Sequence, residues 1–383
     1  MQHRTVQSRR RAPIGVASLL AAAAGACSSE YPIGNLDDSS QPVGFVPDSS
    51  EHGSTGSADF QLDPLLAPAD VTLAADLPVQ VKPAGVGDVD GDGFADFAVA
   101  GFDDAHLISY VHLRYGGPAP VEPEAQFALA ESGARLAFEE GSPQVESIAA
   151  AGDVNGDGFA DVLVTATVCD ALRPTEGAYL LYGGPDRLEG AMRIGSVATH
   201  LTLALPGVSQ GGCATPHDAT LGLGDIDGDG FDDFMLVART TPGYDDTKPA
   251  DDPAFDTTGY LFYGHAEPLA GGTSWLDADA RISAAQPFVP HPLGDVTGDG
   301  RSDVALGAEL GSYYWVPGSA ERLNGAVDLA TRFAPIECAV DQCGAPPVAR
   351  AGDVDGDGVD DVLAYETYSR AHLFYGAPGL LEG

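Results

Sequence analysis

The chain has 383 residues, with 57 Asp or Glu against 18 Lys or Arg, and its formal net charge is −39. Such a molecule repels phosphate backbones and anionic lipid head groups, so the composition excludes nucleic acid as a partner and direct attraction to a membrane surface. With 44% hydrophobic residues the chain is long enough to bury a full core, in one large domain or two smaller ones.

Residues 1–27 are predicted to be an export signal. Several arginines precede an apolar run from Ile14 that is too short for a permanent membrane span. The run ends in a segment that resembles a bacterial lipoprotein signal, and this resemblance implies that Cys27 becomes the lipidated first residue. Ordinary cleavage after Ala26 is the alternative, because small residues before the cut suit both peptidases. We expect an exported protein, lipid-anchored at the outer membrane or cell surface, or else periplasmic or secreted.

Residues 28–60 are dominated by Ser, Gly, Pro and Asp and contain few apolar residues. Such a segment cannot bury enough surface to fold, so it is predicted to be a disordered tether. Residues 61–383 then form the folded part of the chain.

One motif recurs five times in the folded part. It begins at Gly87, Gly152, Gly224, Gly294 and Gly352 and reads GDVDGDGFAD, GDVNGDGFAD, GDIDGDGFDD, GDVTGDGRSD and GDVDGDGVDD. By subtraction, the successive first aspartates lie 65, 72, 70 and 58 residues apart. These spacings are too long for solenoid turns but suit a four-stranded blade, so the repetition predicts an all-β chain folded as a β-propeller.

Each repeat carries the pattern of four strands, here A to D. Strand A leads into the motif, and a short apolar run such as FMLVA follows it as strand B. Strand C ends in an aromatic residue and glycine, as in GAYLLYGG, and strand D is a more polar segment such as ATHLTLAL near Leu201 or AVDLA near Val327. Several strand-C aromatic side chains are expected to pack in the core, namely Tyr182, Phe262, Tyr263, Trp315 and Tyr375.

Five blades are predicted to close into a ring. The sequence ends at Gly383 just after the fifth strand C, while residues 69–75 (ADVTLAA) resemble the strand-D segment near Leu201. An N-terminal strand would therefore complete the last blade, and closure would protect edges that an open stack exposes. A seven-bladed or truncated larger propeller is the alternative.

The repeated loop has the pattern of a calcium site. In D-x-D-x-D-G-x-x-D, side-chain oxygens at positions one, three, five and nine can converge on a hard cation, and glycine permits the tight reversal. The predicted ligands are Asp88, Asp90, Asp92, Asp96; Asp153, Asn155, Asp157, Asp161; Asp225, Asp227, Asp229, Asp233; Asp295, Thr297, Asp299, Asp303; and Asp353, Asp355, Asp357, Asp361. The fourth set is the poorest, because Thr297 replaces a charged ligand and Arg301 adds a positive charge. A metal-free Asp-Gly turn would explain one copy but not five.

Helical calcium loops share these opening letters but supply a bidentate Glu at position 12. That position holds Val99, Val164, Leu236, Leu306 and Ala364, and an apolar strand follows where a helix would be needed. The repeats instead resemble the FG-GAP repeats of integrin α-chain propellers and many bacterial surface proteins, over most of residues 69–383. This resemblance implies that the calcium loop joins the first two strands of each blade and that ligand recognition uses the opposite end of the ring.

The remaining cysteines suit two disulfides. Cys169, Cys213, Cys338 and Cys343 form an even set in a chain predicted to be exported. In an up-and-down blade, the B–C and D–A connections that carry these cysteines lie at the end opposite the calcium loops. The expected pairs, Cys169–Cys213 and Cys338–Cys343, would stiffen long loops, where binding usually resides, or would simply staple them for stability.

The sequence contains little evidence of a catalytic site. The one motif match is the G-x-S-x-G at Ser209, which lacks the strand before and the helix after that a nucleophile elbow needs, and His217 is interpreted as a loop histidine. We therefore expect no catalytic residue and favour a monomeric surface binding or adhesion module. Its partner would be an extracellular protein or glycan, and it would meet the membrane only through a lipid anchor. A polysaccharide- or ester-cleaving enzyme and a purely structural surface protein are the alternatives.

Overall fold

The computed structural model describes residues 73–74, 82–103, 108–118, 127–128, 133–138, 144–167, 176–203, 214–216, 220–240, 256–284, 287–308, 312–333, 335–337, 348–366 and 370–380. The predicted export signal and tether, all five cysteines, Ser209 and His217 lie outside the described residues. Within these ranges, no helix is long and apolar enough to cross a lipid bilayer.

The described part of the chain is mostly β-strand with almost no helix, and most strands lie in five sheets. Sheet 1 holds β2 (Lys82–Gly87), β3 (Asp96–Asp103), β4 (Ile108–Arg114) and β6 (Ala134–Ala137). Sheet 2 holds β7 (Gln144–Gly152), β8 (Asp161–Thr167), β9 (Glu176–Leu181) and β11 (Thr199–Leu203). Sheet 3 holds β13 (Leu221–Gly224), β14 (Asp233–Thr240), β15 (Asp256–Phe262) and β16 (Ala280–Ser283), and β12 (Ala214–Pro216) also pairs with β14.

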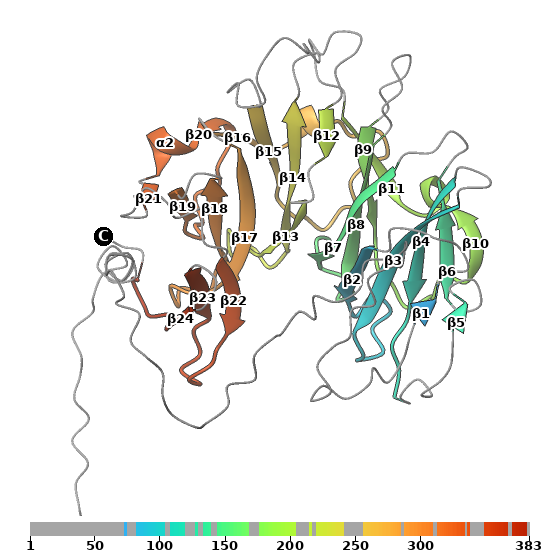
Figure 1. Cartoon of the computed structure of the whole chain (residues 1–383), viewed down its shortest axis with the longest axis horizontal. Helices are drawn as coiled ribbons and strands as arrows, with labels where there is room; N and C mark the ends of the chain where they lie inside the picture. Colours follow the sequence, from blue (N-terminus) through green and yellow to red (C-terminus); the bar gives the residue numbers. More distant parts are fainter. Residues whose placement is uncertain are drawn as a thin grey trace, which may run out of the picture.

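Sheet 4 holds β17 (Phe288–Gly294), β18 (Asp303–Ala308), β19 (Ser312–Val316) and β21 (Pro335–Glu337), and sheet 5 holds β22 (Val348–Gly352), β23 (Asp361–Glu366) and β24 (Arg370–Phe374). The A, B, C and D neighbours within each sheet are antiparallel, which confirms the predicted strand order up to strand C in all five repeats. Figure 1 shows the sheets following one another along an arc, from blue to red. The helical turns are short: η3 (Ile194–Ser196), η4 (Trp275–Asp277) and α2 (Leu329–Arg332).

The first glycine of each motif ends strand A opposite the last aspartate of the loop. Gly152, for example, pairs with Asp161 across a register shift and has a φ of 86°, a left-handed conformation that favours glycine. The same pairing recurs in every sheet. The motif therefore builds a bulged hairpin whose loop projects from one end of the sheet.

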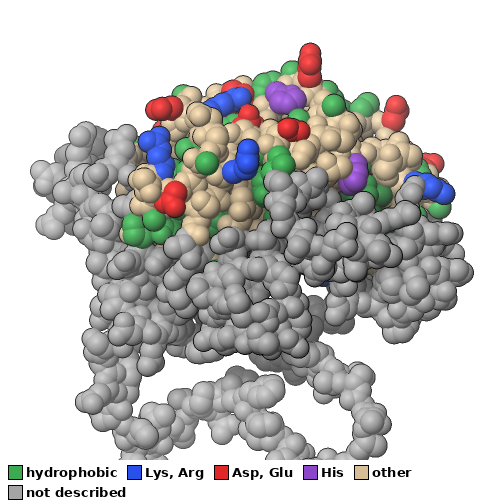
Figure 2. Space-filling view, turned by 90° about the horizontal axis from the view of Figure 1, so that it is seen from above, with side chains coloured by type: hydrophobic (Ala, Val, Ile, Leu, Met, Phe, Trp, Pro, Cys, Tyr) green, Lys and Arg blue, Asp and Glu red, His purple; other side chains and the backbone are tan. Residues whose placement is uncertain are grey.

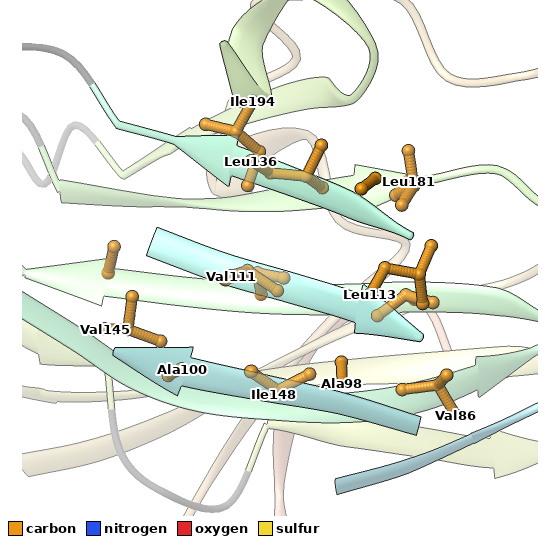
Figure 3. Close-up of a cluster of buried hydrophobic side chains, with 14 of the residues drawn as sticks. Val86, Ala98, Ala100, Val111, Leu113, Leu136, Val145, Ile148, Leu181 and Ile194 are labelled. Atoms are coloured by element: carbon orange, nitrogen blue, oxygen red, sulfur yellow. The ribbon is translucent and has the colours of Figure 1, made fainter. Parts of the chain in front are cut away.

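Hydrophobic cores lie between successive sheets. Alternate residues of one strand face opposite neighbours, so Val162 and Val164 join the core with sheet 1, whereas Leu163 joins the core with sheet 3. Figure 3 shows the first of these cores, where Leu113 and Leu136 of sheet 1 lie among side chains of sheet 2. Because the inner sheets are buried on both faces, their strands read as continuous apolar runs.

The outer edges of the sheets are joined by short parallel strands. β10 (Gly190–Arg193), in the C–D connection of sheet 2, pairs in parallel with β6 of sheet 1, and β20 (Gly325–Asp328) pairs likewise with β16 of sheet 3. An isolated parallel bridge between Thr202 and Ser274 stands at the same place between sheets 2 and 3.

This arrangement corrects one strand assignment. The segment near Leu201 is strand D of sheet 2, as predicted, but the segment around Val327 is β20 on the edge of sheet 3, and β21 is the fourth strand of sheet 4. An edge strand has unpaired backbone N–H and C=O groups that can bind any neighbouring strand. Alternation of polar and apolar residues predicts a strand, but it does not specify the sheet edge with which that strand pairs.

The N-terminal strand has one described pairing. β1 (Leu73–Ala74) runs parallel to β5 (Phe127–Ala128), and it has no pairing with β24. The described residues therefore do not show a closed ring. β5 lies in the C–D connection of sheet 1, the position that β10 and β20 occupy in their own repeats.

A glycine at the end of strand C is required for the close packing of sheets 1 and 2. A Cβ on Gly183 would lie 2.5 Å from the Ala160 carbonyl oxygen and 2.8 Å from that of Val89, whereas a Cβ on Gly184 would have no atom within 4 Å. We predict that Gly183→Ala lowers the free energy of unfolding by about 1 to 3 kcal/mol, because rigid backbone must move. Gly184→Ala is the matched control and should leave stability nearly unchanged. Equal denaturation midpoints for the two variants would contradict this packing.

Candidate metal-binding loops

Five acidic loops join strands A and B and share one fold: loop 1 (88–96), loop 2 (153–161), loop 3 (225–233), loop 4 (295–303) and loop 5 (353–361). The aspartate at position one organises each turn. In loop 1, Asp88 accepts hydrogen bonds from the backbone N–H groups of Gly91 (2.8 Å), Asp92 (3.1 Å) and Gly93 (2.8 Å). These bonds set the reversal and turn the other side chains of the loop toward one another.

The position-nine aspartates are buried and hold the loop to strand C. Asp161 is 0% exposed, and its two oxygens accept the N–H groups of Val154 (2.9 Å) and Gly183 (2.8 Å). The corresponding residues of the other loops, Asp96, Asp233, Asp303 and Asp361, make the same pair of bonds. Position nine is therefore a structural clip as well as a predicted ligand.

Burial raises the pKa of the carboxyl groups of Asp96, Asp161, Asp233 and Asp303. The pKa rises to about 7 for Asp161, about 8 for Asp233 and about 6 for Asp303, mainly because burial penalises the charged form. Repulsion by neighbouring loop aspartates adds to the effect, but it is a smaller cause than burial.

Three of the loops bring carboxylates close enough to share a metal ion. In each set, one oxygen per residue lies within 4.8 Å of the others: Asp88, Asp90 and Asp96; Asp225, Asp227 and Asp229; and Asp353, Asp355 and Asp357. An all-oxygen carboxylate set suits a hard cation such as calcium. Three acidic triads could thus hold metal ions.

Loops 2 and 4 differ at position three. The Asn155 amide donates to Asp157 (2.9 Å), and the buried Thr297 hydroxyl lies 3.5 Å from an oxygen of Asp295. Arg301 pairs with Asp299 at 3.1 Å, so the positive charge expected in loop 4 does face its carboxylates. These two loops carry one acidic side chain fewer at the ligand positions than the other three.

Backbone hydrogen bonds link each loop to the next repeat. The carbonyl at position one accepts the N–H at position eight of the following loop, as in Ala160 to Asp88 (2.9 Å), and the carbonyl at position two accepts an N–H just after the next strand C, as in Gly184 to Val89 (2.9 Å). The same two bonds recur at the junctions between sheets 2 and 3, 3 and 4, and 4 and 5. The loops therefore form a continuous ladder along one end of the arc.

A side chain from each following loop covers the position-four glycine. Phe159 lies over Gly91, where a Cβ would meet the ring at 2.5 Å, and Phe231 lies likewise over Gly156. Arg301 and Val359 take this place at the next two junctions. The glycine and the side chain that covers it come from two successive repeats. The motif of a single loop therefore does not predict this contact.

Two arginines, absent from the predicted site, reach into loops 1 and 3 from the following repeat. Arg187 pairs with Asp90 and with Asp92, the latter at 2.5 Å, and Arg322 pairs with the equivalent residues of loop 3. A sequence signal was available, because an Arg-Leu pair follows strand C by the same interval in the second and fourth repeats.

Tyrosines at the end of strand C bond across the junctions. The hydroxyls of Tyr182 and Tyr263 accept the backbone N–H groups of Leu269 and Leu323, at 2.8 and 2.9 Å. Phe262 and Tyr263 are buried and Trp315 is partly buried, but Tyr375 is 54% exposed. The prediction of core packing was therefore wrong for Tyr375, which directly follows the last described strand.

The opposite end of the sheets is only partly described. The cysteine-bearing connections and residues 241–255 lie outside the described residues. Figure 2 shows one face of the molecule, on whose described part acidic, basic and histidine side chains are scattered without gathering into a patch of one kind.

One family model matches a segment of the chain. Residues 146–168 match the FG-GAP repeat. The match spans β7, loop 2 and β8, so its acidic loop is one of the five described above. No curated protein matches the chain. The matched segment and the acidic triads together suggest a calcium-binding β-repeat domain.

The raised carboxyl pKa values predict the pH dependence of stability without metal. Because the folded-state pKa values of Asp161 and Asp233 exceed the ordinary value near 3.8, the folded chain binds more protons than the unfolded chain between about pH 4 and 8. In chelator, the free energy of unfolding should therefore fall as pH rises from 5 to 8, by about 2 kcal/mol or more. Urea denaturation at several pH values measures this. Asp233→Asn should flatten the slope, and stability that increases toward pH 8 would contradict it.

Proposed function

We propose that the chain is an exported, calcium-stabilised β-propeller that acts as a surface binding or adhesion module. The observation that carries this proposal is the recurrence of one acidic loop, with one hydrogen-bonded junction, through all described repeats. Calcium would neutralise carboxylates at the junctions, and an ion that binds only the folded loops stabilises the fold. Without a bidentate Glu, the affinity should lie in the extracellular range of roughly 10⁻⁴ to 10⁻³ M.

We further propose that the five sheets are blades of a closed ring. Sheets 1 and 5 carry the two halves of a fifth junction: Phe94 is 39% exposed, although its counterparts cover a glycine, and nothing lies within 4 Å of a Cβ on Gly356. Val354 is 53% exposed, whereas its counterparts Val89 and Val154 are 4% and 3% exposed. In the fold of the other junctions, Phe94 would cover Gly356 and Val354 would be buried.

The parallel pairing of β1 and β5 supports the same closure. At three of the four described junctions, the C–D connection of one sheet pairs with strand D of the sheet before it. β5 is such a connection, so β1 occupies the place of a strand D that belongs to the sheet before sheet 1. In a five-bladed ring that sheet is sheet 5, whose described strands are A, B and C.

A matched pair of truncations tests closure. If the ring closes, Val354→Ala and Val89→Ala should each lower the free energy of unfolding by about 2 kcal/mol, because both would remove buried methyl groups. Sedimentation shows whether the chain is monomeric, which separates closure from pairing of two copies. A monomer in which Val354→Ala has no effect while Val89→Ala destabilises would contradict the closed ring.

The calcium loops occupy one end of the blades, so we place recognition on the connections at the other end. Rigid loops on a scaffold commonly carry binding, and disulfides Cys169–Cys213 and Cys338–Cys343 would supply that rigidity. We propose a binding role and no catalysis, with an extracellular protein or glycan as partner. A lipid on Cys27 would hold the chain at the outer membrane or cell surface.

An exchange of one connection tests the binding face. Replacing residues 244–252 by a short Gly-Ser linker should abolish binding on a glycan and protein array while leaving the calcium-dependent rise in melting temperature unchanged. Asp157→Ala in the folded protein is the control on the loop end and should preserve binding. If binding survives the exchange and is lost on Asp157→Ala, recognition lies on the calcium end.

A further inference from the structure

We propose that Arg187 and Arg322 are built-in cations that compete with calcium in loops 1 and 3, so that the loops form two classes of calcium site. This inference rests on the proposed calcium binding and concerns how the chain controls it. Each arginine belongs to one repeat and neutralises the loop of the repeat before it. Calcium and the arginine would therefore exchange at a junction between blades.

Each arginine binds the second carboxylate oxygen of two aspartates in the loop. In loop 1, Asp90 and Asp92 each give one oxygen to a backbone N–H of the loop, at 3.1 and 2.9 Å. Their remaining oxygens accept hydrogen bonds from Arg187. Loop 3 repeats this arrangement with Arg322 on Asp227 and Asp229. A metal ion that coordinates these oxygens must displace the guanidinium or share the oxygens with it.

Burial explains why a counter-charge is needed at position three. The side chains of Asp90 and Asp227 are each 3% exposed, whereas those of the two arginines are 42% and 43% exposed. An ionised carboxylate with so little contact with water is costly unless it is paired. Each guanidinium thus stabilises a buried charge while keeping its own access to solvent, so it can move away when another cation arrives.

A tyrosine positions each arginine. The Arg187 guanidinium carbon lies 5.1 Å from the centre of the Tyr115 ring, and that of Arg322 lies 4.6 Å from the Tyr263 ring. Each tyrosine hydroxyl also accepts the N–H of the leucine that follows the arginine. Stacking and hydrogen bonding therefore hold the Arg-Leu pair against the loop of the preceding repeat.

Charge and arginine vary together through the repeats. Loops 1 and 3 have Asp at position three and face an arginine, whereas loop 2 has Asn155 there and Pro268 at the position of the arginine. Loop 4 has Thr297, and Leu380 stands at the position of the arginine. Loops 1 and 3 thus pair the charge at position three with an arginine of the following repeat, whereas loops 2 and 4 lack that charge.

Loop 5 stands apart among the described residues. It keeps the full aspartate set, with Asp355 exposed at position three. No described arginine pairs with Asp355, and Arg350 pairs instead with Asp360 at position eight, at 2.9 Å. By Coulomb's law, a cation site loses affinity when a fixed positive charge stands a few Å away. We therefore expect loop 5 to bind calcium before loops 1 and 3.

Calcium titration of the full chain by calorimetry tests this. The double variant Arg187→Gln, Arg322→Gln should bind calcium about tenfold more tightly at two sites, because the competing charges are gone. In chelator the same variant should melt about 2 to 5 °C lower than the wild type, because Asp90 and Asp227 lose their partners. Arg332→Gln removes an exposed positive charge that no described ion pair uses, and it should change neither quantity.

A second variant, which adds an aspartate–arginine pair to loop 2, provides an independent test if Arg187→Gln, Arg322→Gln folds poorly. Asn155→Asp combined with Pro268→Arg builds the same pair at loop 2, and it should need more calcium for half-saturation than Asn155→Asp alone. Unchanged or weaker calcium affinity in Arg187→Gln, Arg322→Gln would overturn the competition. If neither the wild type nor any variant binds calcium, the proposed function itself is wrong. If all of them bind calcium with the same affinity, only the competition by the arginines is overturned.

Discussion

The fold depends on how one short acidic loop satisfies its own backbone while binding the next repeat. The buried aspartate at position nine accepts an N–H from its loop and an N–H from the end of strand C, as Asp161 does with Val154 and Gly183. With that side chain in place, the carbonyls at positions one and two are free to accept N–H groups from the following repeat. The same nine residues therefore close a hairpin, fix a sheet and join two sheets.

Junction packing makes the repeats dependent on one another. Each inner sheet is buried on both faces, so no single repeat could cover its own apolar residues. Leu363 and Leu373 of sheet 5 are 41% and 36% exposed, whereas their counterparts in sheet 2, Leu163 and Leu180, are 1% and 0% exposed. Metal ions at the loops would strengthen the polar half of each junction, while the cores supply the apolar half.

Much of this architecture could be predicted from the repeated motif. The five loops, the strands on either side of them and the acidic clusters follow from spacing and alternation within one repeat. Features that link two repeats could not be found in this way. The pairing of β20 with β16, the covering of Gly91 by Phe159 and the ion pair from Arg187 to Asp90 each join residues far apart in the sequence. Periodicity within a strand carries no information about which neighbour completes a contact.

We propose that one junction geometry repeats around the whole ring, including between sheets 5 and 1. Amide hydrogen exchange of the monomer in calcium tests it directly, because the N–H groups of Ala160 and Gly184 are bonded across a described junction. Ala95 and Gly117 occupy the same positions in sheet 1. In a closed ring, the amides of Ala95 and Gly117 should be protected like those of Ala160 and Gly184. Fast exchange at Ala95 and Gly117, with protection retained at Ala160 and Gly184, would show that the ring is open.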